Sequence, residues 1–120
     1  MRFSVALSVA TAAMLVAAGA PSTTRAQTGL LSTEAQLQGC EAFVEDAPTA
    51  NQMQIGACAG GVAAALDIGQ GAGRVCLPAD TGLVAAARVV TDFIQESAQR
   101  RSRRFGELAL EALALRWPCR

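Results

Sequence analysis

The side chains that usually perform acid–base catalysis are scarce in this 120-residue chain. It contains no histidine, lysine or tyrosine, which are among the residues that enzymes most often use to move protons. Ser32, Ser97 and Ser102 have no histidine to activate them, which excludes a serine–histidine arrangement. We therefore expect no catalytic nucleophile of this kind.

Two pairs of glutamates remain as candidates for chemistry. Glu41 and Glu45, like Glu107 and Glu111, stand four residues apart, which puts both members of a pair on one face of a helix. A hydrolase with two carboxylates could use such a pair, but this spacing is more typical of a solvated helix face. Nothing in the sequence places either pair in a cleft, so we predict that the chain is not an enzyme.

Four cysteines form the other reactive group: Cys40, Cys58, Cys76 and Cys119. An even number of cysteines in a small exported protein is typical of a disulfide framework. A zinc site is not indicated, because the chain has no Cys-x-x-Cys pair and no histidine. We expect two disulfides, no metal and no cofactor.

Arginines crowd one short segment, which holds Arg100, Arg101, Arg103 and Arg104. In one interpretation they form a cationic patch at the tip of a helix hairpin and dock on an acidic protein partner. In the other they form a soluble turn, in which Arg103 and Arg104 pair with the glutamates that follow. The run is short for binding to an anionic membrane.

The N-terminal segment, residues 1–26, has the layout of a secretory signal peptide. A positive start at Arg2 precedes an apolar run over residues 5–18, and Thr24-Arg25-Ala26 ends in a small residue. We expect residues 1–26 to be removed after Ala26, which leaves residues 27–120 as a periplasmic domain. The apolar run is shorter than a membrane-spanning helix requires, so no stable membrane insertion is expected after cleavage.

The charge balance of residues 27–120 is mildly acidic, with eight arginines against ten acidic residues. A nucleic-acid-binding domain usually has a basic excess. No nucleic-acid partner is therefore expected.

Apolar residues recur at helical spacing along this domain and do not alternate for long, which predicts four helices and no strand. The first begins near Thr33, where Thr33 and Gln36 fit a capping box, and ends before Pro48. Short connections make consecutive helices antiparallel neighbours. We predict an all-α fold, a small four-helix bundle of two antiparallel helical hairpins with two disulfides.

The second helix is expected over about residues 50–68. Its apolar and small residues at helical spacing line one stripe: Met53, Ala57, Gly60, Gly61, Ala64 and Ile68. The adjacent glycines indicate either a close helix contact or a weak helix. The Gly-x-Gly that follows lacks the preceding strand of a phosphate-binding loop, so we predict a flexible connection with Gly69 capping the helix.

We expect Asp80 or Thr81 to cap the third helix, which should end near Ser97. Its inner stripe comprises Leu83, Ala87, Val90 and Ile94. The fourth follows the arginines and runs to about residue 116, with Leu108, Leu110, Leu113 and Leu115 around most of its surface. Such a helix is either central in the bundle or partly covered by a partner.

Hairpin geometry predicts which cysteines pair. Residues at equal distances from the turn of an antiparallel hairpin lie opposite each other. Cys40 and Cys58 are each nine residues from Thr49 in the first turn, and Cys76 and Cys119 bracket the second turn. We predict the disulfides Cys40–Cys58 and Cys76–Cys119.

Short motifs follow one another in a recognisable order along the domain. They are Leu37-Gln-Gly-Cys40, Gly56-Ala-Cys58-Ala-Gly60, Val75-Cys76-Leu77-Pro78, Val89-Val90 with Phe93-Ile94, and Ala112-Leu113 leading to Trp117-Pro118-Cys119. This ordered set resembles the Rap/Tai immunity family, which neutralises peptidoglycan amidase effectors of type VI secretion. The chain departs from the pattern at Gly61, where members usually have an aromatic residue. It departs again at residues 96–101, where many have a His-Pro-Glu turn.

The resemblance implies a periplasmic all-helical domain, often a homodimer, that occludes the active site of an effector. The leading hypothesis is an immunity-type protein that binds and inhibits a cell-wall amidase, with Arg100, Arg101, Arg103 and Arg104 as candidate partner-binding residues. The alternative is an orphan exported helical module that binds protein in a structural or envelope role and has no toxin partner.

Overall fold

The computed structural model describes residues 29, 31–47 and 49–120, and the regular secondary structure of this part is helical. The helices are α2 (Thr33–Glu45), α3 (Gln52–Gly71), α4 (Leu83–Gln95), the 3₁₀ helix η1 (Ala98–Ser102) and α5 (Phe105–Arg116). The described residues contain no strand and only one isolated bridge, between Val75 and Pro118. The predicted all-α fold with four helices is confirmed, whereas the expected signal peptide lies outside the described residues.

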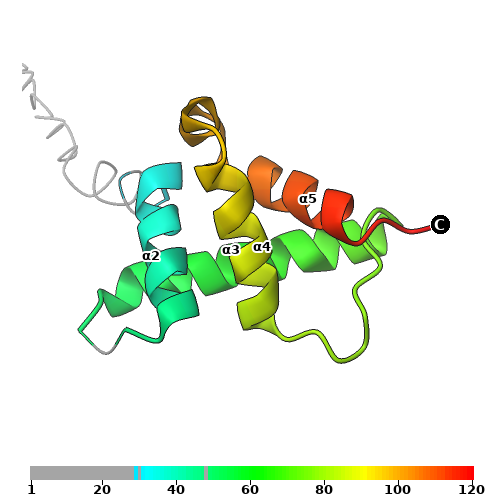
Figure 1. Cartoon of the computed structure of the whole chain (residues 1–120), viewed down its shortest axis with the longest axis horizontal. Helices are drawn as coiled ribbons and strands as arrows, with labels where there is room; N and C mark the ends of the chain where they lie inside the picture. Colours follow the sequence, from blue (N-terminus) through cyan, green and yellow to red (C-terminus); the bar gives the residue numbers. More distant parts are fainter. Residues whose placement is uncertain (1–28, 30, 48) are drawn as a thin grey trace, which may run out of the picture.

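Helix α3 is the longest helix and contacts α2, α4 and α5. Figure 1 shows α2 and α4 lying across α3, with α5 next to α4 and over the C-terminal part of α3. The consecutive helices α2 and α3, and α4 and α5, contact each other as the hairpin prediction requires. No helix within the described ranges is long and apolar enough to cross a membrane.

The core lies where the four helices meet. Its largest fully buried side chains are Leu37, Val62, Val75, Val90, Ile94, Leu108 and Leu113. The predicted inner stripe of α4 is buried at Ala87, Val90 and Ile94, and Leu83 packs against the core at its edge.

The buried face of α3 differs from the stripe identified by spacing. The residues of α3 that are buried are Cys58, Val62, Ala65 and Gly69, whereas Met53 and Ile68 are 67% and 61% exposed. Because α3 has apolar or small residues on nearly every side, spacing alone does not separate its inner face from its outer face. The packing partners of α3 decide which face is buried.

Three helix ends also differ from the prediction. Ser32 caps α2, because its hydroxyl accepts a hydrogen bond from the Ala35 amide at 3.2 Å. The capping-box assignment to Thr33 and Gln36 is therefore wrong, and both side chains bond elsewhere. Helix α4 begins after Gly82 with no side-chain cap. The prediction that Asp80 or Thr81 caps it is therefore wrong.

Helix α3 continues beyond the predicted cap at Gly69 and ends at Gly71. Gly69 is buried inside the helix, where a Cβ would lie 2.6 Å from Val75 Cγ2 and 2.9 Å from Leu110 Cδ1. The residue that turns the chain is Gly73, with a φ of +67°, a conformation that glycine adopts at no steric cost. Gly69 therefore serves close packing and Gly73 serves the turn.

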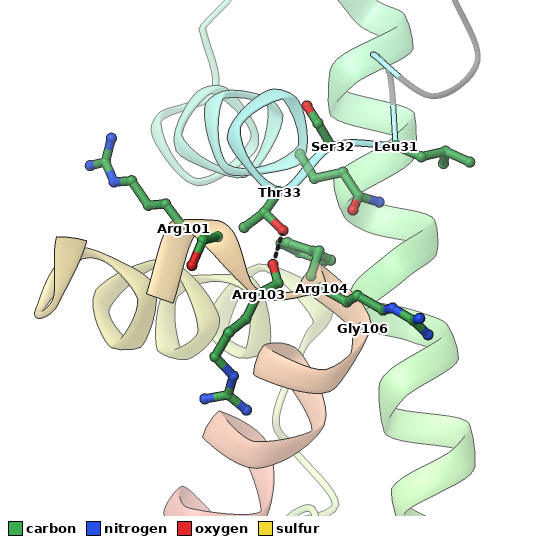
Figure 2. Close-up of a pocket in the computed structure, with 10 residues that line it drawn as sticks. Leu31, Ser32, Thr33, Arg101, Arg103, Arg104 and Gly106 are labelled. Carbon is green, nitrogen blue, oxygen red and sulfur yellow. Dashed lines mark hydrogen bonds between the residues drawn. The ribbon is translucent and has the colours of Figure 1, made fainter. Parts of the chain in front are cut away.

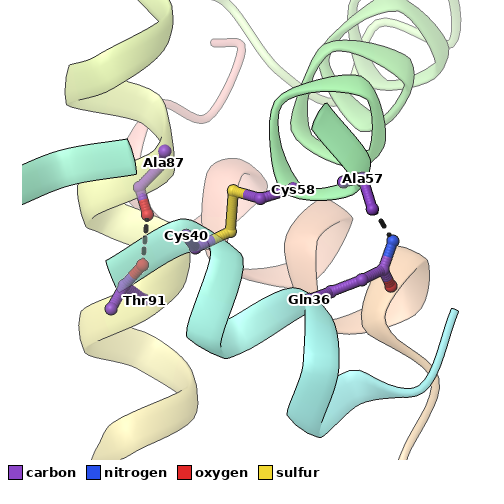
Figure 3. Close-up of a disulfide and its surroundings, with 6 residues drawn as sticks. All are labelled: Gln36, Cys40, Ala57, Cys58, Ala87 and Thr91. Atoms are coloured by element: carbon purple, nitrogen blue, oxygen red, sulfur yellow. Dashed lines mark hydrogen bonds between the residues drawn. A yellow bond between two sulfur atoms is a disulfide. The ribbon is translucent and has the colours of Figure 1, made fainter. Parts of the chain in front are cut away.

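Both disulfides join the cysteines that hairpin geometry pairs. Cys40–Cys58 links α2 to α3 with a Cα–Cα distance of 5.1 Å, and both residues are fully buried; Figure 3 shows the bond between the two helices. Cys76–Cys119 links the segment before α4 to the C-terminal residues at 5.0 Å. Beside it the Cys76 amide donates to the Trp117 carbonyl at 2.8 Å.

The residue next to the buried disulfide allows α2 and α3 to approach closely. A Cβ at Gly39 would lie 2.0 Å from the Gln54 carbonyl oxygen and 2.3 Å from its carbonyl carbon. No side chain fits at such distances, and the obstacle is backbone, which cannot rotate away as a side chain can. The contact between these two helices therefore depends on glycine at position 39.

Candidate functional site

The four glutamates of the two pairs are exposed or half-buried, and three of them make hydrogen bonds or ion pairs. Glu41 accepts from Gln95 Nε2 at 2.6 Å, which ties α2 to α4. Glu111 pairs with Arg103 at 2.7 Å and Glu107 lies 4.0 Å from Arg104. Within the described ranges no three metal-ligating side chains gather in one place. Such pairs are typical of a solvated helix face rather than of a catalytic dyad.

The arginine segment, residues 100–104, spans the end of η1 and the connection to α5. Arg100 folds back onto the end of α4: its Nη1 donates to the Phe93 carbonyl and to Glu96, the latter at 3.1 Å. Its guanidinium also stacks 3.7 Å over the Phe93 ring. Arg100 therefore holds the connection against α4.

We predict that Arg100→Ala lowers the free energy of unfolding by about 1 to 2 kcal/mol, because it removes a charge-assisted hydrogen bond and a cation–π contact. Arg100→Lys should recover only part of the loss, since lysine keeps the charge but not the planar stack. Arg104→Ala is the control, with an expected change within about 0.5 kcal/mol at an exposed site. Urea unfolding measures all three, and equal stability of the alanine variants would contradict the role given to Arg100.

The other three arginines point outward in different directions. Figure 2 shows the side chains of Arg101, Arg103 and Arg104 diverging from one short stretch of backbone. Arg101 pairs with Glu34 at 3.3 Å and Arg103 with Glu111, and each arginine side chain is 45% exposed. Arg104 is 87% exposed. Local pairing of Arg103 with the following glutamates thus occurs as one of the two interpretations predicts.

A hollow of about 660 Å³ lies between the start of α2 and the junction of η1 with α5. Its lining includes Leu31, Thr33, Gln36, Phe105 and the arginines at 101, 103 and 104. Two lining side chains hold it in shape: the Thr33 hydroxyl donates to the Arg103 carbonyl (Figure 2), and Gln36 Nε2 donates to the Ala57 carbonyl at 3.3 Å (Figure 3). The hollow therefore combines an apolar floor with a cationic rim.

The sequence predicts a role for the arginines but gives no indication that Leu31, Thr33 and Gln36 lie beside the arginine segment. Thr33 and Gln36 stood out only as a capping pair. The signal that could have been used is Ser32, which supplies the cap of α2 and leaves the side chains of Thr33 and Gln36 without a role at the helix end. Polar side chains of this kind commonly bond to another part of the fold when buried.

The arrangement can bind a partner through charge and apolar contact, and nothing in it supplies a nucleophile with a base. Comparison with known proteins agrees with this interpretation: a family model described as Rap1a immunity proteins matches residues 32–119. No curated protein and no solved structure matches the chain.

Proposed function

Because the chain belongs to the Rap1a immunity protein family, we propose that it acts in the periplasm, where it binds and inhibits a peptidoglycan amidase effector of type VI secretion. The matched region begins at the α2 cap, Ser32, and ends at the last cysteine, Cys119. It therefore includes both disulfides and the arginine segment. An immunity protein of this kind spares the producing cell from a secreted effector.

The cysteine chemistry supports a location outside the cytoplasm. Both disulfides are formed and no described cysteine is free. Disulfides persist in oxidising compartments such as the periplasm and are rare in the cytosol. Peptidoglycan lies in the same compartment, so the inhibitor and the substrate of its target would share one space.

The arginine segment is the proposed contact with the effector. Exposed ion pairs such as Arg101–Glu34 and Arg103–Glu111 contribute only about 0 to 1 kcal/mol each. The arginines can therefore exchange these carboxylates for acidic groups of a partner at little cost. Arg100, anchored on Phe93, keeps the segment in place while its neighbours bind, and the bound domain covers the effector's active site. A homodimer, which the resemblance implies, is part of this proposal.

Co-expression in a bacterial host tests the proposal. A cognate amidase directed to the periplasm is expected to lyse cells, and this protein, exported with it, is expected to restore growth. A variant with Arg101→Glu and Arg103→Glu should protect less well, because it repels acidic groups of the partner. A matched variant with Arg74→Glu and Arg88→Glu, at exposed positions outside the segment, should protect as the unmodified protein does. Equal killing with and without the protein would refute the proposal.

A further inference from the structure

A second hollow, of about 210 Å³, lies between α3 and α5. Apolar side chains form most of its walls, among them Ala64, Ile68 and Leu110. It shares Gln36, Phe105 and Gly106 with the first hollow. The two hollows are therefore neighbours, and we call them together the α3–α5 groove; Leu31 lines the first hollow and Ile68 the second.

The groove exposes large apolar side chains that nothing in the described fold covers. Leu31 is 64% exposed in the first hollow and Ile68 is 61% exposed in the second. Between them Phe105 forms the floor against Gly61, where a Cβ would lie 2.9 Å from the Phe105 ring. Glycine at position 61 thus allows the Phe105 ring to pack directly against α3, and position 61 places no side chain in the groove.

The charged residues that line the groove are all positive. Among the described residues that line the two hollows none is acidic. Arg104 is 87% exposed at the rim, and its nearest carboxylate, Glu107, is 4.0 Å away. In Figure 2 the side chains of Leu31 and Arg104 extend on the same side, toward α3. An occupant that fits must carry an apolar side chain and, beside it, a carboxylate.

The geometry points to a docking site for the effector: the α3–α5 groove binds a segment of the effector in which apolar side chains flank an Asp or Glu. The apolar side chains pack on Leu31 and Ile68, and the carboxylate pairs with Arg104. This inference rests on the proposed function and extends it, because Ile68 lies on α3, outside the arginine segment.

The test measures the affinity of a catalytically inactive cognate amidase by calorimetry. Ile68→Gln replaces an apolar side chain by a polar one that favours helix, and should weaken binding about tenfold or more if the side chain becomes buried in the complex. Met53→Gln makes the same change at an equally exposed position near the start of α3, and should leave affinity unchanged. Circular dichroism confirms that each variant is folded.

Salt dependence separates the two parts of the contact. Arg104→Gln should also weaken binding about tenfold, and the loss should shrink as ionic strength rises, because salt screens an exposed ion pair. The loss in Ile68→Gln should not depend on salt.

The outcomes distinguish the groove from the function. If the amidase binds the unmodified protein and Ile68→Gln equally well, the groove is not its docking site and the proposed function stands. If Ile68→Gln alters only self-association in sedimentation, the groove belongs to a second copy of the chain and the inference is wrong. If the amidase does not bind the unmodified protein at all, both proposals fail.

Discussion

Replacement of Gly39 by alanine is expected to lower the free energy of unfolding by about 3 kcal/mol or more. The added Cβ would lie 2.0 Å from the Gln54 carbonyl oxygen, so α2 and α3 must separate. Overpacking of a well-packed site typically costs about 1 to 3 kcal/mol, and a backbone obstacle places this change at the upper end. The separation also strains the neighbouring Cys40–Cys58 link, which holds the same two helices together.

Gly60→Ala is the matched control, because no atom outside the helix backbone lies within 4 Å of a Cβ built there. Alanine favours an exposed helix interior over glycine by about 1 kcal/mol, so this variant should be slightly more stable than the unmodified protein. Urea unfolding with the disulfides intact measures both changes. A Gly39→Ala variant as stable as the unmodified protein would show that α2 and α3 do not approach as described.

Removal of the buried disulfide is the second large effect. Cys40 and Cys58 close a loop of 18 residues, and in the chain-entropy model such a link contributes about 3 kcal/mol. For a domain of this size the Cys40→Ala, Cys58→Ala double variant should melt roughly 10 to 25 °C lower. Differential scanning calorimetry measures the shift, and an unchanged melting temperature would contradict the stabilising role of the link.

The two disulfides should also differ in how readily they are reduced. Both sulfurs of Cys40–Cys58 belong to fully buried residues, whereas Cys76 is exposed. A thiol must reach a sulfur atom to open a disulfide, so mild reduction of the folded protein should open Cys76–Cys119 first. Alkylation followed by mass spectrometry identifies the free cysteines, and opening of the buried link first would contradict this order.

The disulfide pairing was accessible from sequence because it depends on simple geometry. In hairpins with short turns, equal distance from the turn brings two residues together, and this placed Cys40 opposite Cys58 without knowledge of the core. The inner face of α3 was not accessible in this way. Met53 and Ile68 match the helical period as well as Val62 does, and only contacts with the other helices show which of them is buried.

The glycines show the same division between local and tertiary signals. Gly73 has the positive φ that a turn requires, but the pattern of glycines near it did not single it out from Gly69. Gly39 has no local signature at all, since its requirement arises from Gln54 on another helix. Among the arginines, the Arg100–Glu96 pair is visible from i,i+4 spacing, whereas the Arg101–Glu34 pair joins residues far apart in the sequence.

These observations give a consistent physical picture of a binding protein. Two disulfides and close helix packing hold a small helical domain together. Arg100 holds the arginine segment on that domain. The other arginines make exposed ion pairs that a partner's carboxylates can replace. An inhibitor benefits from such rigidity, because a surface that is ordered before binding loses less conformational entropy on binding.

The most direct test of the central claim is the activity of a purified cognate amidase on isolated peptidoglycan as this protein is added. We expect release of cleaved peptide to fall stoichiometrically to the background level, and the Arg101→Glu, Arg103→Glu variant to inhibit more weakly. Full amidase activity in the presence of a large excess of folded, disulfide-bonded protein would contradict this claim.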